Sequence, residues 1–242
     1  MKWGGRRSIA LGLLAVFLSG CFCPAVVSAQ QADNSSVVQH IDAAVQARFE
    51  NTLGYFVTEQ YAVFRNNDLV HPAAQMTVKT TYRKETGKSY EILSQSGSEL
   101  IRRLVLSVIL ENEKRINLPG NREGSWITSA NYQMKLKPGG TQQMDGRDCY
   151  VLDIAPRRKA PNLLVGTLWV DVKDGSIVKI QGTASASASV FTGPTEMMRQ
   201  YSNLNGYAMA THARAVANSF LFGQTIVTID YRDCQIQLRP IR

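Results

Sequence analysis

The sequence predicts a β-rich α+β fold. Three observations support this class: helical spacing of apolar residues near the start of the mature chain, a second and more apolar helical segment, and a nearly continuous series of short alternating segments from residue 126 onward. The chain has 242 residues, of which 44% are hydrophobic and 19% charged. It is therefore long enough to bury a core and too apolar to be intrinsically disordered.

Residues 1–29 have the organisation of a secretory signal, with a basic start, an apolar stretch over residues 9–23 and small residues before a cleavage point after Ala29. A second interpretation competes at the same place. Leu-Ser-Gly-Cys at 18–21 is similar to the bacterial lipobox, in which acylation of the cysteine, here Cys21, anchors the protein to a membrane. Both interpretations predict export, to the periplasm or to a membrane facing it.

Removal of residues 1–29 also lowers the charge, from +8 to +5, because the segment holds three basic residues and no acidic ones. This modest excess, without an aromatic–basic reading motif, argues against nucleic acid as a partner. The mature chain has no run of 18 apolar residues, which excludes a polytopic membrane protein. We expect a short flexible segment at 30–35 and a single domain over 36–242.

The first expected helix spans residues 36–51, with Asn34 and Ser35 as its caps. After Gly54 the apolar period changes from helical spacing to two, which predicts strands. The three strands expected before the next helix lie at 55–63, 76–84 and 89–94.

The second expected helix spans about residues 96–115 and begins at a capping box formed by Ser96 and Glu99. Unlike an ordinary surface helix, it is apolar around most of its circumference. It should therefore be covered on more than one side, either within an ordinary core or as a lid over an apolar cavity.

The remainder of the chain predicts an antiparallel sheet. The expected strands are 128–136, 149–154, 166–172, 176–183, 213–222 and 225–232, with a short helical turn near 194–199. The expected turns are Pro138-Gly139-Gly140, Asp145-Gly146, Asp174-Gly175 as a type I′ hairpin, and Gly223-Gln224. Alternation predicts that eight residues face inward: Tyr150, Leu152, Ile154, Leu168, Val170, Val172, Val178 and Ile180.

No motif predicts catalysis, a cofactor or a metal site. Asp171 and Asp174 flank a hairpin, where aspartate commonly supports the turn. The two cysteines left after cleavage, Cys149 and Cys234, form either a disulfide or two buried free thiols. A hydrolase that uses Cys149 with His212 is the weakest of the functional hypotheses, since the histidine has no visible orienting partner.

A basic loop, Arg157-Arg158-Lys159, lies between two expected strands. Such a run is usually a solvated loop. The alternative is a contact with anionic lipid headgroups or with an acidic partner surface, where each basic residue contributes about 1 kcal/mol.

The order of elements resembles a known superfamily. The residues that carry the resemblance are the tyrosine-rich strand at 55–61, Leu168-Trp169-Val170-Asp171, and Ile177-Val178-Lys179-Ile180 after the turn. The likeness covers roughly residues 36–236 and is to the LolA/LolB-like superfamily of periplasmic lipoprotein carriers and receptors. It implies a strongly curved antiparallel sheet, an incomplete barrel, whose concave face is covered by helices and receives acyl chains.

We therefore expect a non-enzymatic periplasmic lipid- or lipoprotein-binding carrier without cofactors. The alternative is an envelope sensor or scaffold that uses the same fold to bind a protein partner. Trp169 alternates with Leu168 and Val170, which leaves its orientation open. Periodicity selects as candidate lipid-cavity residues Tyr61, Tyr82, Ile92, Leu104, Val105, Val108, Leu152 and Trp169.

Overall fold

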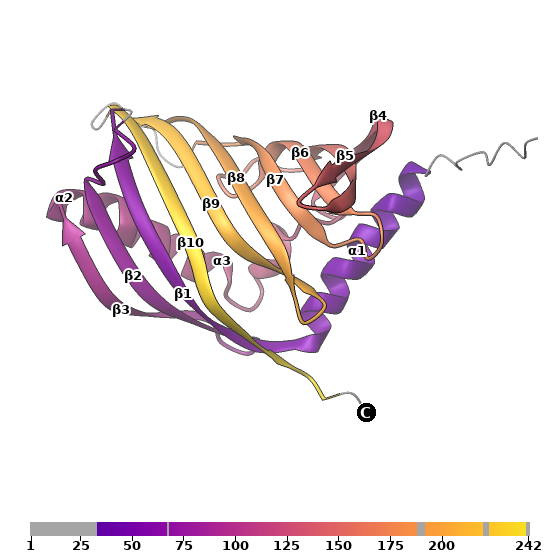
Figure 1. The fold of residues 1–242 in the computed structure, drawn as a ribbon, viewed down its shortest axis with the longest axis horizontal. Coiled ribbons are helices and arrows are strands. Elements are labelled where there is room, and N and C mark those ends of the chain that lie inside the picture. The colour runs from indigo at the N-terminus through magenta and orange to yellow at the C-terminus, as the bar shows by residue number, and fades with distance from the viewer. Residues whose placement is uncertain (1–32, 67, 188–191, 220–222, 241–242) are drawn as a thin grey trace, which may run out of the picture. The chain divides into compact units, whose positions relative to one another are not determined.

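Ten antiparallel strands form one sheet, and the helices lie on one of its faces (Figure 1). The computed structural model describes residues 33–66, 68–187, 192–219 and 223–240. The strand order is β3-β2-β1-β10-β9-β8-β7-β6-β5-β4, so β3 and β4 are the two edges of an open, curved sheet. The predicted β-rich α+β class is thereby confirmed, whereas the predicted signal and Cys21 lie outside the described residues.

The first half of the chain contributes the helices and one edge of the sheet. Its elements are α1 (Asn34–Asn51), β1 (Thr52–Arg65), β2 (Ala74–Arg83), β3 (Gly87–Gly97), α2 (Glu99–Ile101), the π-helix η1 (Arg102–Leu106), α3 (Ser107–Ile116) and the 3₁₀ helix η2 (Arg122–Ser125). Because α2, η1 and α3 follow one another without a break, they act as one covering helix. No helix in the described ranges has the length and hydropathy needed to span a membrane.

The second half of the chain is a meander of adjacent strands. These are β4 (Tyr132–Met144), β5 (Arg147–Pro156), β6 (Leu164–Asp171), β7 (Ile177–Ala184), β8 (Thr192–Leu204), β9 (Tyr207–Ser219) and β10 (Gly223–Leu238). The last strand, β10, closes the order by pairing with β1 from the start of the chain.

Both helices begin at positions other than those the sequence predicted. The cap of α1 is Asp33, whose carboxylate accepts from the amide of Ser36 at 3.3 Å. Asn34 instead accepts at 2.7 Å from the amide of Leu136, and so pairs with the backbone of edge strand β4. The capping box at Ser96 is also wrong, because Ser96 belongs to β3 and Ser98 caps the second helix.

Three turn predictions need correction. The segment at 138–140 is no hairpin but lies within β4, where the register with β5 shifts between Leu136 and Thr141. The segment at 194–199 is strand β8, not a helical turn. The turn at Asp174-Gly175 is not type I′, since positive φ occurs only at the glycine. Asp174 does support that turn, by accepting from the amide of Ser176 at 2.8 Å.

Two glycines allow the sheet to bend between β6 and β7. Gly166 and Gly182 pair directly and face the concave side, as do the buried neighbours Leu168 and Ile180. A Cβ atom on Gly166 would overlap the carbonyl oxygen of Gln181, and one on Gly182 would overlap that of Val165. Residues without side chains therefore let the two strands approach closely on the inside of the curve.

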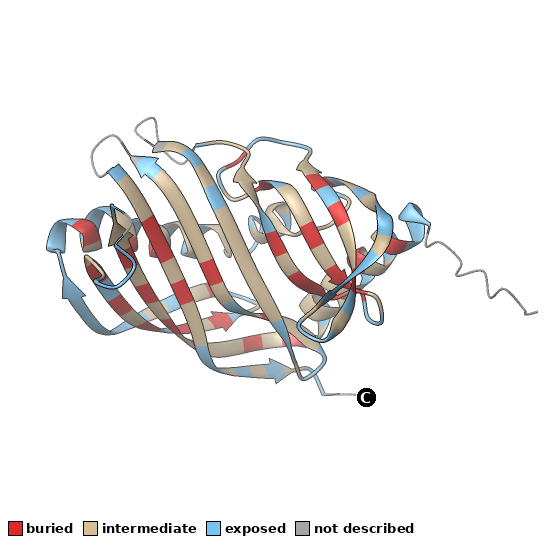
Figure 2. Ribbon diagram, turned by 45° about the horizontal axis from the view of Figure 1, so that its top comes forward, coloured by how far each residue is buried: buried red, intermediate tan, exposed pale blue. Residues whose placement is uncertain are grey.

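The core consists of two separate apolar clusters on the concave face. In the first, Val37 and Ile41 of α1 pack against β4–β7. In the second, the covering helix packs against β1, β2, β9 and β10 through Ile101, Leu106 and Leu110. Figure 2 shows the two groups of buried segments on either side of the middle of the sheet. Six of the eight inward positions predicted by alternation are buried, whereas Tyr150 and Val172 are half-buried.

Candidate functional site

The concave face is least covered over β8, between the two clusters. None of the β8 residues whose burial is described is buried, although the strand lies in the interior of the sheet order. The concave-facing residues here are Met197 and Arg199 of β8, opposite Ala215 and Ala213 of β9. We call the half-buried residues Met197, Arg199, Ala215 and Ala217 the uncovered strip.

Small side chains form the floor of the uncovered strip. Ala213, Ala215 and Ala217 take successive concave-facing positions on β9, where β10 contributes Ile229, Val227 and Thr225. An alanine side chain leaves more space above a sheet than the valine, leucine or isoleucine at comparable positions of β6 and β7. The alternating alanines are visible in the sequence, and they are the signal that marks this region without a structure.

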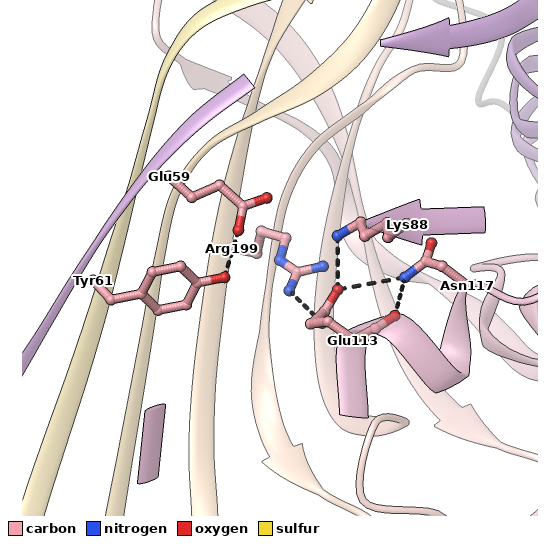
Figure 3. Close-up of polar contacts among 6 residues, drawn as sticks. All are labelled: Glu59, Tyr61, Lys88, Glu113, Asn117 and Arg199. Carbon is pink, nitrogen blue, oxygen red and sulfur yellow. Dashed lines mark hydrogen bonds and ion pairs between the residues drawn. The ribbon is translucent and has the colours of Figure 1, made fainter. Parts of the chain in front are cut away.

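An acidic residue of α3 contacts both an edge strand and an interior strand at the border of the strip (Figure 3). The carboxylate of Glu113 lies 2.9 Å from the ammonium of Lys88 on β3 and 3.7 Å from the guanidinium of Arg199 on β8. The side-chain amide of Asn117 donates to the backbone carbonyl of Glu113 at 2.7 Å. One helix residue thus connects an edge strand with a strand from the interior of the sheet.

The ion pair shifts the pKa of both partners. The Lys88 ammonium lowers the pKa of the Glu113 carboxyl to about 2, against the opposing effect of burial. Burial by itself would lower the pKa of Lys88, but Glu113 acts together with Tyr55, Tyr90 and Glu59 to outweigh burial, and the pKa is raised well above its ordinary value. Both groups are therefore charged at neutral pH.

A second acidic residue, Glu59 of β1, also faces the concave side. It is 1% exposed, and the hydroxyl of Tyr61 donates to its carboxylate. Burial, followed by the charge of Glu59, raises the pKa of this tyrosine. Glu59 is not among the residues predicted from the sequence, although it alternates with Val57 and Tyr61 on the apolar face of the strand.

The structure separates the eight candidate cavity residues. Tyr61, Tyr82 and Leu152 are buried, and Val105 packs at the edge of the second cluster. Ile92 of β3, with Leu104 and Val108 of the covering helix, is about half exposed. None of these seven belongs to the uncovered strip.

The eighth candidate, Trp169, lies on the sheet face opposite to Leu168 and Val170, which are buried in the first cluster. Its indole nitrogen donates to Gln142 at 2.9 Å, and the ammonium of Lys179 lies 5.0 Å from its ring. Alternation therefore places Trp169 away from the concave face.

The covering helix exposes a stripe of apolar residues. Leu100, Leu104 and Val108 recur every four residues and are 58%, 50% and 49% exposed. The expectation that this helix is covered on more than one side is therefore wrong for the chain by itself. Its buried face is Ile101, Leu106 and Leu110, because only that side meets the sheet.

The basic loop binds its own chain. Arg157 donates to the carbonyl oxygen of Ser129 at 2.9 Å, and Arg158 donates to that of Gly124. Lys159 is exposed. The two arginines thus connect the β5–β6 loop to η2 and to the segment that follows it.

The two cysteines are free thiols. Cys149 on β5 and Cys234 on β10 are five strand spacings apart, about 24 Å along the sheet, which is too far for a disulfide. His212 on β9 is four spacings from Cys149 and pairs with Asp230 at 2.7 Å, so the hydrolase hypothesis lacks its geometry. Burial raises the pKa of the Cys149 thiol. Among the described residues, no group of three or more His, Cys, Asp or Glu could hold a metal ion.

Two hollows lie on the opposite, outer face of the sheet. One of 300 Å³ is lined by polar residues of β1–β3 and by Asp230, including Gln60, Gln75 and Thr77. The other, of 430 Å³, lies over β4–β6 beside Val165 and Asp153. The outward-facing side chains that line these hollows alternate, along each strand, with the inward-facing side chains of the two core clusters.

Several solved structures resemble this fold. A LolA superfamily protein from Nitrosomonas europaea is 13% identical, with 86% of this chain and 96% of that chain covered and a TM-score of 0.43. A putative outer membrane lipoprotein-sorting protein domain from Vibrio parahaemolyticus is 14% identical, with 84% and 94% covered and a TM-score of 0.45. A DUF1329 family protein from Desulfovibrio piger is 13% identical, with 85% and 94% covered and a TM-score of 0.41.

No protein-family model and no curated protein matches the sequence. One of these structures is described as a LolA superfamily protein, and this is the superfamily that the sequence resembles. At this level of identity and TM-score they assign neither ligand nor partner, so any functional argument depends on the residues of the chain itself.

Proposed function

We propose that this protein is a non-enzymatic, exported lipid- or lipoprotein-binding protein that receives an acyl chain along the uncovered strip. The observation that carries the proposal is that no β8 residue of described burial is buried, although β8 lies between the two apolar clusters, and that alanines of β9 lie beside it. Each methylene group that leaves water contributes about 0.8 kcal/mol, so a strip with apolar walls suits an alkyl chain. The proposed location is the periplasm, with Cys21 as the anchor if it is lipidated.

Ala215→Trp tests this proposal, because an indole would occupy the space above the floor of the strip. We expect the affinity of delipidated protein for a fluorescent fatty acid to fall at least tenfold, with an unchanged thermal unfolding midpoint. The matched control is Asn218→Trp, on the exposed outer face of the same strand, which should bind like the unmodified protein. Undiminished binding by Ala215→Trp, or loss of folding from overpacking, would count against an open strip.

A second candidate function is the binding of an envelope protein. Among the described residues, nine large apolar side chains are exposed, and eight of them lie between residues 69 and 118. These eight are Leu69, Val70, Ile92, Leu93, Leu100, Leu104, Val108 and Leu118. Concentration of exposed apolar residues in one part of a chain is typical of a protein–protein contact.

This candidate predicts the result of photo-crosslinking in cells. A crosslinking amino acid at Leu104 should give a discrete adduct with one envelope protein, because the exposed stripe would lie in the contact. The control position is Val165, which is 51% exposed and lies beside the outer hollow. Equal adducts at both positions, or none at Leu104, would contradict a specific partner there.

A further inference from the structure

Arg199 is the accessible charge of the uncovered strip. It extends from β8 toward α3, and 34% of its side-chain surface is exposed, compared with 24% for Glu113 and 10% for Lys88. A guanidinium on the concave face of a strand in the interior of the sheet would be expected to be covered. Its accessibility means that a ligand lying on the strip can reach it.

The carboxylate of Glu113 does not use all the donors of Arg199. Lys88 is its close partner at 2.9 Å, whereas the guanidinium nitrogen of Arg199 is 3.7 Å away, beyond hydrogen-bond distance. A guanidinium carries five N–H donors in a planar fork, so this distant ion pair leaves donors for a further group.

The charges at this border favour an anion. Lys88 and Arg199 share a single carboxylate, that of Glu113, which leaves one positive charge in excess among the three. The nearby Glu59 is 1% exposed and its carboxylate is bonded to Tyr61, so it does not reach the strip as an accessible acid. The positive charge that remains accessible is that of Arg199.

The apolar part of the strip begins next to this charge. Met197 and Thr195 precede Arg199 on the same face of β8, opposite Ala215 and Ala217. The five residues from Thr195 to Arg199 span about 13 Å at the rise of a β-strand. The arrangement is thus amphipathic: a cationic end followed by a floor of small apolar side chains.

We infer that the ligand is an anionic amphiphile whose carboxylate or phosphate head binds the guanidinium of Arg199 while its alkyl chain lies over Ala215 and Ala217. This inference rests on the proposed function and names the chemical class of its ligand. The planar fork of arginine binds carboxylate and phosphate through two parallel hydrogen bonds. A neutral head of the same size leaves the excess positive charge of Lys88, Glu113 and Arg199 unbalanced.

The test is a titration of delipidated protein with three ligands that share a dodecyl chain: dodecanoate, dodecyl phosphate and dodecan-1-ol, each below its aggregation concentration. Both anions should bind at least tenfold more tightly than the alcohol. Whichever of the two anions binds with the higher affinity identifies the natural head group, either that of a free fatty acid or that of a phosphate-bearing lipid. Equal affinity for all three would overturn the inference and leave acyl-chain binding in place, whereas binding of none would overturn the proposed function as well.

Arg199→Gln should remove the preference for the anions and leave the affinity for dodecan-1-ol unchanged. Its matched control is Arg214→Gln, which changes an arginine on the opposite face of the adjacent strand and should keep the preference. Persistence of the preference in Arg199→Gln would contradict the assignment of the head to this residue. If Arg199→Gln does not fold, the comparison of the three ligands on the unmodified protein still decides the inference.

Discussion

Gly166→Ala is expected to destabilise the folded protein by at least about 3 kcal/mol, or to prevent it from folding. The new methyl group would overlap the carbonyl oxygen of Gln181 and lie 2.5 Å from the Cα of Gly182. Both obstacles are backbone atoms of β7, so neither can rotate away. The strands would have to separate where the sheet bends, and urea unfolding followed by circular dichroism measures the loss.

Gly193→Ala is the matched control for this prediction. Gly193 lies in β8, where an added Cβ would meet only the carbonyl oxygen of Asn218, at the ordinary contact distance of 3.4 Å. Its free energy of unfolding should stay within about 0.5 kcal/mol of that of the unmodified protein. If Gly166→Ala unfolds at the same urea concentration as this control, the close approach of β6 and β7 is not needed for the fold.

Glu113→Gln is expected to lower the free energy of unfolding by about 3 kcal/mol. The change leaves the ammonium of Lys88, which is 10% exposed, facing a neutral amide, and it also removes the counter-charge of Arg199. Urea unfolding measures the effect. The control is Glu111→Gln, an exposed position of the same helix, which should be nearly neutral. Replacing both partners by apolar residues, as Lys88→Met with Glu113→Leu, should recover most of the loss.

The same ion pair predicts a loss of stability in acid. The pKa of Glu113 is about 2 in the folded protein and about 4.5 without the fold, so the unfolded chain takes up this proton first as the pH falls. The stabilisation is complete above about pH 4.5 and is lost as the pH approaches 2. The stability of the unmodified protein should decrease more steeply over this window than that of Glu113→Gln, and parallel pH profiles would contradict the role of the carboxylate.

Local patterns in the sequence predicted most of the elements and their buried faces. Leu152, Leu168 and Ile180 were expected to face inward because alternation along a strand depends only on neighbouring residues, and all three are buried. The turn at Asp145-Gly146 is confirmed for the same reason, with positive φ at both residues. One local signal was missed: Asn205-Gly206 also has positive φ at both residues and joins β8 to β9.

Tertiary structure overruled local signals where a residue found a distant partner. Asn34 is a good helix cap by composition, yet it pairs with the backbone of β4, a hundred residues later in the chain. Trp169 is apolar enough for a cavity, yet its position in the alternation places it on the outer face with Gln142 and Lys179.

By itself, then, the sequence determined a β-rich α+β chain in which one helix precedes the first three strands and another follows them. It could do so because residue spacing and turn chemistry are properties of contiguous residues. Only the tertiary structure decided that Lys88, Glu113 and Arg199 meet and that Ala215 and Ala217 of β9 lie half-buried between two cores. That outcome depends on the strand order, in which β10 pairs with β1 and thereby brings β8 within reach of α3. Pairing over such distances is decided by the burial of whole faces, which no local pattern records.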